Sequence, residues 1–203
     1  MLNEIYKKPV VLNKEIHKDI KISPYENYSF AKDAYIVPIS LEEALVAMKT
    51  LLVVFIQEGK DNFTPAVILG TSETKNLLLD KDNNWKKEKY IPATIRAYPF
   101  GLGIDNNKNE KFIMLDSESD VLKGKDGFNL FDNAEFSKNG QQAIGFVQNV
   151  YTGIDKSKEF ISHINALGIL KNATLTIEKD KEKFEIPNLF VIDENELNKL
   201  ESR

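Results

Sequence analysis

Residues 51–79, LLVVFIQEGKDNFTPAVILGTSETKNLLL, carry the clearest indication of the fold class. They hold three apolar runs of strand length, at 51–56, 66–69 and 76–79, and glycine or polar turn residues separate them. The connections are too short to contain the helix that a parallel crossover requires. The pattern therefore predicts an antiparallel meander of adjacent hairpins.

A helical pattern follows in the second half of the chain, over residues 141–167. Its apolar residues recur at spacings of three, four or seven, which is typical of one buried helical face. Gly168 is well placed to end the helix, whereas Gly153 lies near its middle and costs about 1 kcal/mol relative to alanine. We therefore expect either one long helix or two shorter ones. The apolar positions are Ile144, Val147, Tyr151, Ile154, Ile161, Ile164 and Leu167.

The other predicted elements are short. Residues 1–30 contain Pro9 and Pro24 and are predicted to form an irregular arm, which Tyr25, Tyr28 and Phe30 anchor to the domain. The remaining elements are a strand at 34–39, a helix at 41–49 capped by Ser40, a hairpin of 102–105 and 111–115 around a turn at 106–109, strands at 173–179 and 184–192, and a final short helix capped by Asp193.

These elements predict one α+β domain over residues 1–203, in which a mainly antiparallel sheet packs against one long or broken helix and several short helices. The chain is 42% hydrophobic, which is enough to bury a core without metals or cross-links. A net charge of −4 does not fit a protein that binds nucleic acid. No apolar stretch approaches the ~20 residues that span a bilayer, so no membrane span is expected.

The absence of cysteine excludes disulfides and thiolate chemistry and fits a reducing compartment. The first residues lack the apolar centre of a secretory signal, so we expect a cytoplasmic protein. The two histidines, His17 and His163, are far apart, and no metal site is predicted. Serine-hydrolase and Walker motifs are missing, and Gly101-Leu102-Gly103 has no third glycine, so no cofactor is predicted.

Residues 85–101, WKKEKYIPATIRAYPFG, form the most unusual segment. They contain the only tryptophan, Trp85, together with Tyr90, Tyr98 and Arg96, the one arginine inside an otherwise lysine-based chain. A short helix is predicted from Pro92 to Tyr98. A planar guanidinium holds a carboxylate or phosphate at two points, or stacks on a ring.

Two interpretations of this arginine stay open. In the first, Arg96 pairs internally with a carboxylate, such as Asp80 or Asp116, and locks the helix to the sheet. In the second, Arg96 clamps an anionic group of a ligand beside the aromatic rings. Asp116 and Glu118 share one face of a strand, which allows acid–base work but is also common at solvated strand ends.

The block at residues 90–100, YIPATIRAYPF, resembles the Y[VI]PxxIRxYPF block of the SapC family. The start at residues 6–13 with His17, the stretch 76–85, and Asp116 with the three residues that follow it also resemble that family, in order. Leu130-Phe131-Asp132 and residues 190–198 continue the likeness, which covers nearly the whole chain. Family members are associated with bacterial surface-layer loci.

The resemblance implies a non-enzymatic binding or accessory protein of a surface-layer or related system. Its expected partner is a protein, a peptide or a small anionic ligand. The alternative is an enzyme or enzyme partner that acts on an amino acid or peptide, with Arg96 as carboxylate anchor and Asp116 or His17 as proton carrier. The candidate ligand-binding residues are Arg96, Trp85, Tyr90, Tyr98, Asp116 and His17.

Overall fold

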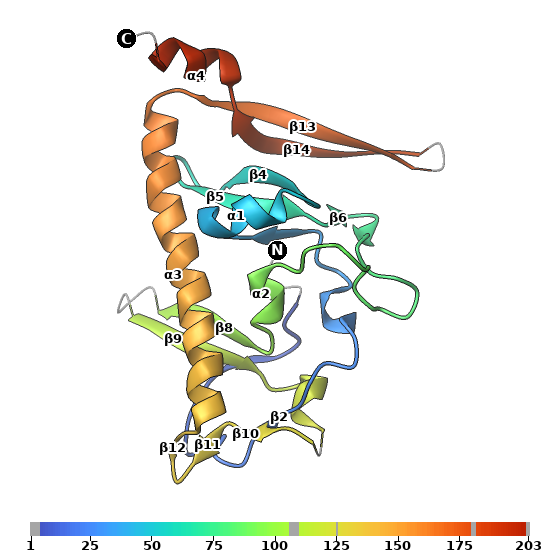
Figure 1. The fold of residues 1–203 in the computed structure, drawn as a ribbon, viewed down its shortest axis with the longest axis vertical. Coiled ribbons are helices and arrows are strands. Elements are labelled where there is room, and N and C mark those ends of the chain that lie inside the picture. The colour runs from blue at the N-terminus through green and yellow to red at the C-terminus, as the bar shows by residue number, and fades with distance from the viewer. Residues whose placement is uncertain (1–4, 106–109, 125, 180–181, 202–203) are drawn as a thin grey trace.

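Helix α3, Lys138–Ala166, runs along most of the molecule and lies beside both of its main sheets (Figure 1). A computed structural model describes residues 5–105, 110–124, 126–179 and 182–201. Ser137 caps the helix by accepting a hydrogen bond from the Gly140 N–H (3.0 Å). Helix α3 contacts both the larger and the smaller sheet, so it joins the two halves of the core.

The helix is continuous through Gly153, so the single long helix, of the two forms predicted, is the one observed. Gly153 faces the start of helix α1, Leu41–Ala47, where an added Cβ would lie 3.1 Å from Ser40 Cβ. One turn later the buried Ser157 accepts a hydrogen bond from the Leu41 N–H (2.8 Å) and donates to the Gly153 carbonyl (2.7 Å). The glycine thus allows close packing of two helices rather than a break.

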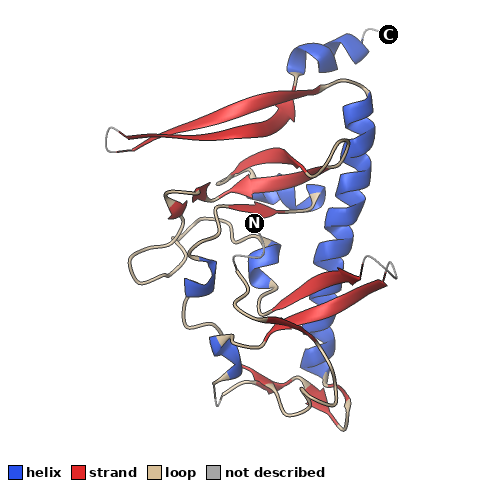
Figure 2. Ribbon diagram, turned by 180° about the vertical axis from the view of Figure 1, so that it is seen from behind, coloured by secondary structure: helices blue, strands red, loops and turns tan. Residues whose placement is uncertain are grey.

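The larger sheet has five strands, all antiparallel, in the order β13-β14-β4-β5-β3. Figure 2 shows β13 and β14 as a long ribbon that projects beside the rest of the sheet. Every residue of the interior strand β5 is buried, as expected for a strand covered on both faces. The strands are β3 (Ile36–Pro38), β4 (Leu52–Gln57), β5 (Phe63–Ile68), β13 (Leu170–Lys179) and β14 (Glu182–Ile192).

The predicted meander is right for its first two strands and wrong for the third. Residues 76–79 leave the sheet because the buried Asn76 side chain donates to the Ala31 carbonyl (3.0 Å) and accepts from the Leu78 N–H (2.9 Å). Beyond Asn76 the Leu77 N–H donates to the Leu69 carbonyl (2.9 Å), and Leu79 forms an isolated bridge with Trp85. Strands β3, β13 and β14 complete the sheet instead.

The smaller sheet has the order β1-β9-β8, and the predicted hairpin forms its β8–β9 pair. The predicted turn at 106–109 lies outside the described residues. The N-terminal arm is more regular than predicted, because two of its segments pair with later strands. The bounds are β1 (Pro9–Val11), β2 (Lys21–Ile22), β6 (Gly70–Thr71), β7 (Lys75–Asn76), β8 (Phe100–Asp105), β9 (Glu110–Asp116), β10 (Phe128–Asn129), β11 (Phe131–Asp132) and β12 (Glu135–Phe136).

The short helices begin where polar caps were expected. Ser40 accepts from the Glu43 N–H (3.1 Å) at the start of α1, and Asp193 accepts from the Asn195 N–H (3.0 Å) at the start of α4, Glu194–Glu201. Helix α2, Ala93–Arg96, is a single turn that ends before the predicted limit at Tyr98. Two 3-10 turns, Ser29–Ala31 and Asp120–Leu122, complete the described elements.

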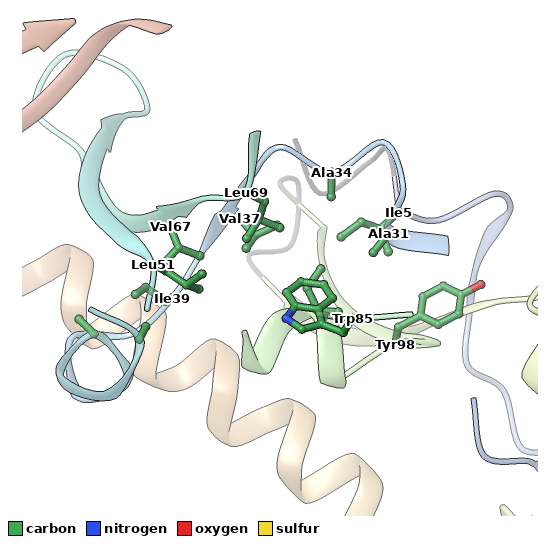
Figure 3. Close-up of a cluster of buried hydrophobic side chains, with 13 residues drawn as sticks. Ile5, Ala31, Ala34, Val37, Ile39, Leu51, Val67, Leu69, Trp85 and Tyr98 are labelled. Carbon is green, nitrogen blue, oxygen red and sulfur yellow. The ribbon is translucent and has the colours of Figure 1, made fainter. Parts of the chain in front are cut away.

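Two hydrophobic clusters meet at the segment 95–100. The upper cluster joins α1 and the larger sheet to the arm, and it includes Ile95, Trp85 and Tyr98 (Figure 3). The lower cluster joins the smaller sheet to α3, and it includes Ala97 and Phe100. Neighbouring side chains of one short segment therefore belong to different parts of the core.

Replacement of the buried Ser157 by alanine should lower the free energy of unfolding by about 1–2 kcal/mol, because the Leu41 N–H loses its acceptor. The matched control is Thr152→Ala on the exposed side of the same helix, which should change stability by only a few tenths of a kcal/mol. Urea denaturation of the two variants measures the difference. Equal stability of the two variants would contradict the packing described for α1 and α3.

Candidate functional site

Arg96 is the only exposed residue of the segment 93–100. Helix α2 is fixed on its other sides, because Ile95 and Ala97 pack into different clusters and the Thr94 hydroxyl donates to the Pro38 carbonyl (3.1 Å). Only one side of the turn therefore faces solvent, and Arg96 lies on that side.

The Arg96 guanidinium is held by neighbours rather than by an acidic partner. Its Nε donates to the Ile91 carbonyl (3.2 Å) and its Nη2 donates to the Tyr90 hydroxyl (3.3 Å). Its Cζ lies 5.9 Å from the centre of the Tyr90 ring and 5.3 Å from that of the Phe146 ring. Within the described residues Arg96 forms no salt bridge, and three of its five N–H donors have no protein acceptor.

Internal pairing of Arg96 with Asp80 or Asp116 is not formed. The Asp80 carboxylate accepts from the N–H groups of Asp82 and Asn84 in its own exposed turn. The Asp116 carboxylate is buried among donors from the N-terminal arm. The first of the two interpretations of Arg96 is therefore wrong for both named partners.

A pocket of about 420 Å³ opens beside Arg96. Four segments form its walls: the arm at 22–25, the α2–β8 segment at 96–100, the start of β10 at 127–128, and Ala143 with Phe146 on α3. Most of the lining is apolar, and Arg96 is the one charged side chain among the described residues that line it. This volume lies within the usual range for small-molecule sites, about 300–1,000 Å³.

Two hydroxyl groups of the arm line the pocket, and only that of Tyr25 is hydrogen-bonded, because the buried Ser23 hydroxyl has no partner among the described residues. The Tyr25 hydroxyl donates to the backbone carbonyls of Tyr98 and Arg96. Burial raises the pKa of the Tyr25 hydroxyl, so this group stays neutral and serves as a donor. The charge of the pocket thus comes from Arg96 alone among its described lining residues.

Glu43 on α1 lies close enough to influence Arg96 electrostatically. Burial raises the pKa of Glu43, although the Ala93 N–H, Tyr90 and the positive charge of Arg96 partly offset this effect. Its carboxylate accepts the Ala93 N–H (2.6 Å) and so caps the first turn of α2. Glu43 does not line the pocket, and it positions the turn that carries Arg96.

The structure brings together only part of the predicted set. Tyr90 lies against Arg96, and Tyr98 contributes to the pocket wall. The Tyr98 ring stacks on Phe30 (4.0 Å between centres), and its hydroxyl points away from the upper cluster (Figure 3). Trp85 is buried in that cluster, packs edge-on against Tyr28, and does not line the pocket.

Asp116, at the end of β9, is fully buried and lies behind the pocket wall rather than in it. Its carboxylate accepts from the N–H groups of Lys7 and Lys8 and from the Tyr98 hydroxyl, each at 2.9 Å, and from the Glu118 N–H at 3.2 Å. Burial alone would raise the pKa of Asp116, but these donors together hold it below its usual value. Asp116 therefore fastens the arm to the α2–β8 segment.

His17 has a local role in the arm. The Asn13 N–H donates to His17 Nδ1 (2.9 Å), and the ring is almost wholly buried. His17 does not line the pocket, nor does Asp116, so the geometry brings neither proposed proton carrier to Arg96. Ligand binding by Trp85, Asp116 or His17 stays a prediction.

Sequence reasoning missed the wall that α3 supplies. Ala143, Phe146 and Val150 follow each other at spacings of three and four, which forms a second apolar stripe beside the one identified. That stripe could have indicated a partner for the α2 segment. In the residues that the structure describes, no cluster of three or more His, Asp or Glu side chains could hold a metal ion, and no helix is long and apolar enough to cross a membrane.

Replacement of Asp116 by asparagine should lower the free energy of unfolding at pH 7 by about 2–3 kcal/mol, because three backbone N–H donors lose a charged acceptor. The folded pKa of Asp116 is depressed, so its contribution is complete above the usual pKa of about 3.9 and is lost as the pH falls through the folded value. The difference between wild type and variant should therefore be constant from pH 6 to 8 and shrink below about pH 4.

Urea titrations at several pH values test this, with Asp82→Asn in an exposed turn as the control. The control should stay within about 0.5 kcal/mol of wild type. A difference between Asp116→Asn and wild type that persists unchanged at low pH would show that the carboxylate charge is not what stabilises the arm.

Comparison with known proteins gives one match. The SapC family model matches residues 12–203, nearly the whole chain. No curated protein and no solved structure matched the chain. The Arg96 turn and the pocket walls all lie within the matched region. The protein therefore belongs to the SapC family.

Proposed function

We propose that this protein is a non-enzymatic binding protein whose site is the pocket beside Arg96, and that its ligand is a peptide or a small anionic molecule. The observation that carries the proposal is an exposed guanidinium, unpaired with any described carboxylate, at the edge of an apolar pocket. Such an arrangement combines one orienting charge with a surface that gains free energy when a ligand covers it.

The fixed position of Arg96 supports recognition rather than a general surface charge. Two hydrogen bonds and the Phe146 ring orient the guanidinium before any ligand arrives. Pre-orientation lowers the conformational entropy that binding would otherwise cost. A surface lysine, by comparison, keeps most of its rotamer freedom.

The enzyme alternative has less support. Its proposed proton carriers, Asp116 and His17, are engaged in structural hydrogen bonds and do not line the pocket. The geometry offers a place to bind an anion but no titratable acid or base among the described lining residues besides tyrosine. An accessory role in a bacterial surface-layer or related system, and a cytoplasmic location, stay predictions.

Thermal unfolding in the presence of small anions and short peptides tests the proposal. At about 100 times its Kd a true ligand should raise the Tm by about 5 °C or more. Arg96→Gln should abolish this protection while its own Tm stays within about 2 °C of wild type, because the side chain is exposed and makes only two peripheral hydrogen bonds.

The matched control is Lys89→Gln, which removes one exposed positive charge from the same segment without touching the pocket. Protection should be retained in this variant. If no anion or peptide protects the wild type, or if protection survives Arg96→Gln, the proposed function is wrong.

A further inference from the structure

We infer that the ligand carries a single carboxylate attached to an apolar body, and that the body enters the pocket while the carboxylate binds Arg96. The inference rests on the proposed function and narrows its ligand class. The carboxylate can belong to a free acid or to the C-terminal residue of a peptide, because both present the same group beside an apolar chain or ring.

The walls define the body of the ligand. Three phenylalanine rings, those of Phe100, Phe128 and Phe146, line the pocket together with the small side chains of Ala97 and Ala143. Because the two alanine side chains are small, the space between the rings stays open. Ile22, Pro24 and Pro99 extend the apolar lining. A hydrated, polar body would lose its hydrogen bonds to water against these walls and gain few in return.

The charge at the pocket selects a singly charged group. Arg96 is the one charged side chain among the described lining residues, and the neighbouring Glu43 carboxylate weakens its field. A dianion such as a phosphate monoester would have a second charge with no described partner in the lining. A carboxylate, in contrast, matches the guanidinium with two parallel hydrogen bonds.

The position of the guanidinium sets the orientation of the ligand. Its Cζ lies 5.3 Å from the centre of the Phe146 ring, so the charge borders directly on an apolar wall. Nε and Nη2 already donate to Ile91 and Tyr90, which leaves the remaining N–H donors for a ligand. A ligand bound there places its carboxylate at the edge of the pocket and its adjoining carbons against Phe146.

The volume limits the size of the body. About 420 Å³ holds about a dozen non-hydrogen atoms at the ~30 Å³ that each water occupies in the liquid. Decanoate and 4-phenylbutyrate both have this size, one as an alkyl chain and the other with a ring. Acetate has the same charge without the body, and decanol has the same body without the charge.

Calorimetric titration of the full chain with these four compounds tests the inference. Decanoate or 4-phenylbutyrate should bind at least about 100-fold more tightly than acetate, because several buried methylene or ring carbons contribute. Decanol should bind at least about tenfold more weakly than decanoate. Arg96→Gln should reduce the affinity for decanoate by about tenfold or more and leave that for decanol unchanged.

A second variant fills the pocket instead of removing its charge. Ala143→Phe places a ring in the space between the walls and should lower the affinity for decanoate at least about tenfold. The control is Gln142→Phe, one residue away on the exposed side of α3, which should bind decanoate as wild type does. Far-ultraviolet circular dichroism and the Tm identify a variant that fails to fold, and Ala143→Met then replaces it.

Two further titrations identify the source of the carboxylate. If the ligand is the C-terminal end of a peptide, N-acetyl-Gly-Gly-Phe should bind more tightly than its C-terminal amide. If decanoate or 4-phenylbutyrate binds tightly and the peptide does not, the ligand is a free carboxylic acid. Two outcomes would overturn this inference and leave the proposed function standing. In the first, inorganic phosphate binds through Arg96. In the second, acetate binds through Arg96 as tightly as decanoate does. If no anion binds through Arg96, both are wrong.

Discussion

The burial of one short turn from two sides governs the rest of this structure. Helix α2 and the residues after it contribute Ile95 to the upper cluster and Ala97 to the lower one. The side chains of a single helical turn point in only a few directions, and those of Ile95 and Ala97 occupy most of these directions. The remaining direction leads outward, so the position of Arg96 is a consequence of core packing rather than of surface chemistry.

The same turn connects stability to the proposed site. Asp116 holds the arm through the Lys7 and Lys8 N–H groups and binds Tyr98, which follows the turn. The arm in turn supplies one wall of the pocket, and Phe146 on α3 supplies another. A change that loosens the buried carboxylate would therefore move one wall relative to the others. The pocket depends on groups that no ligand touches.

The elements that the sequence predicts correctly are those that depend on residues close together in the chain. The spacing of apolar residues in 141–167 repeats every turn, and it identified α3 within a few residues. The hairpin of β8 and β9 and the caps at Ser40 and Asp193 are equally local. The third strand of the meander failed because the Asn76 side chain binds Ala31, a contact between distant segments that alternation of residues does not reveal.

The candidate site shows the same division between local and distant information. Arg96 stands out in the sequence because it is the one internal arginine, and Tyr90 lies close to it in the chain. Trp85 belongs to the same unusual segment, yet it packs against Tyr28 in the upper cluster. The pocket itself comes from four segments that only the tertiary fold assembles. Composition can single out a residue, but the surfaces around it require long-range packing.

The choice of arginine follows from this geometry. At Arg96 the side chain must reach the Ile91 carbonyl and the Tyr90 hydroxyl at once, lie over Phe146, and still present donors outward. A guanidinium separates its five donors over a rigid plane, so two can orient the group while others remain available. A lysine ammonium gathers its three donors on one nitrogen and has no plane to stack on a ring. In a chain whose other internal basic residues are all lysine, this position is the one where the difference between the two side chains decides what the surface can bind.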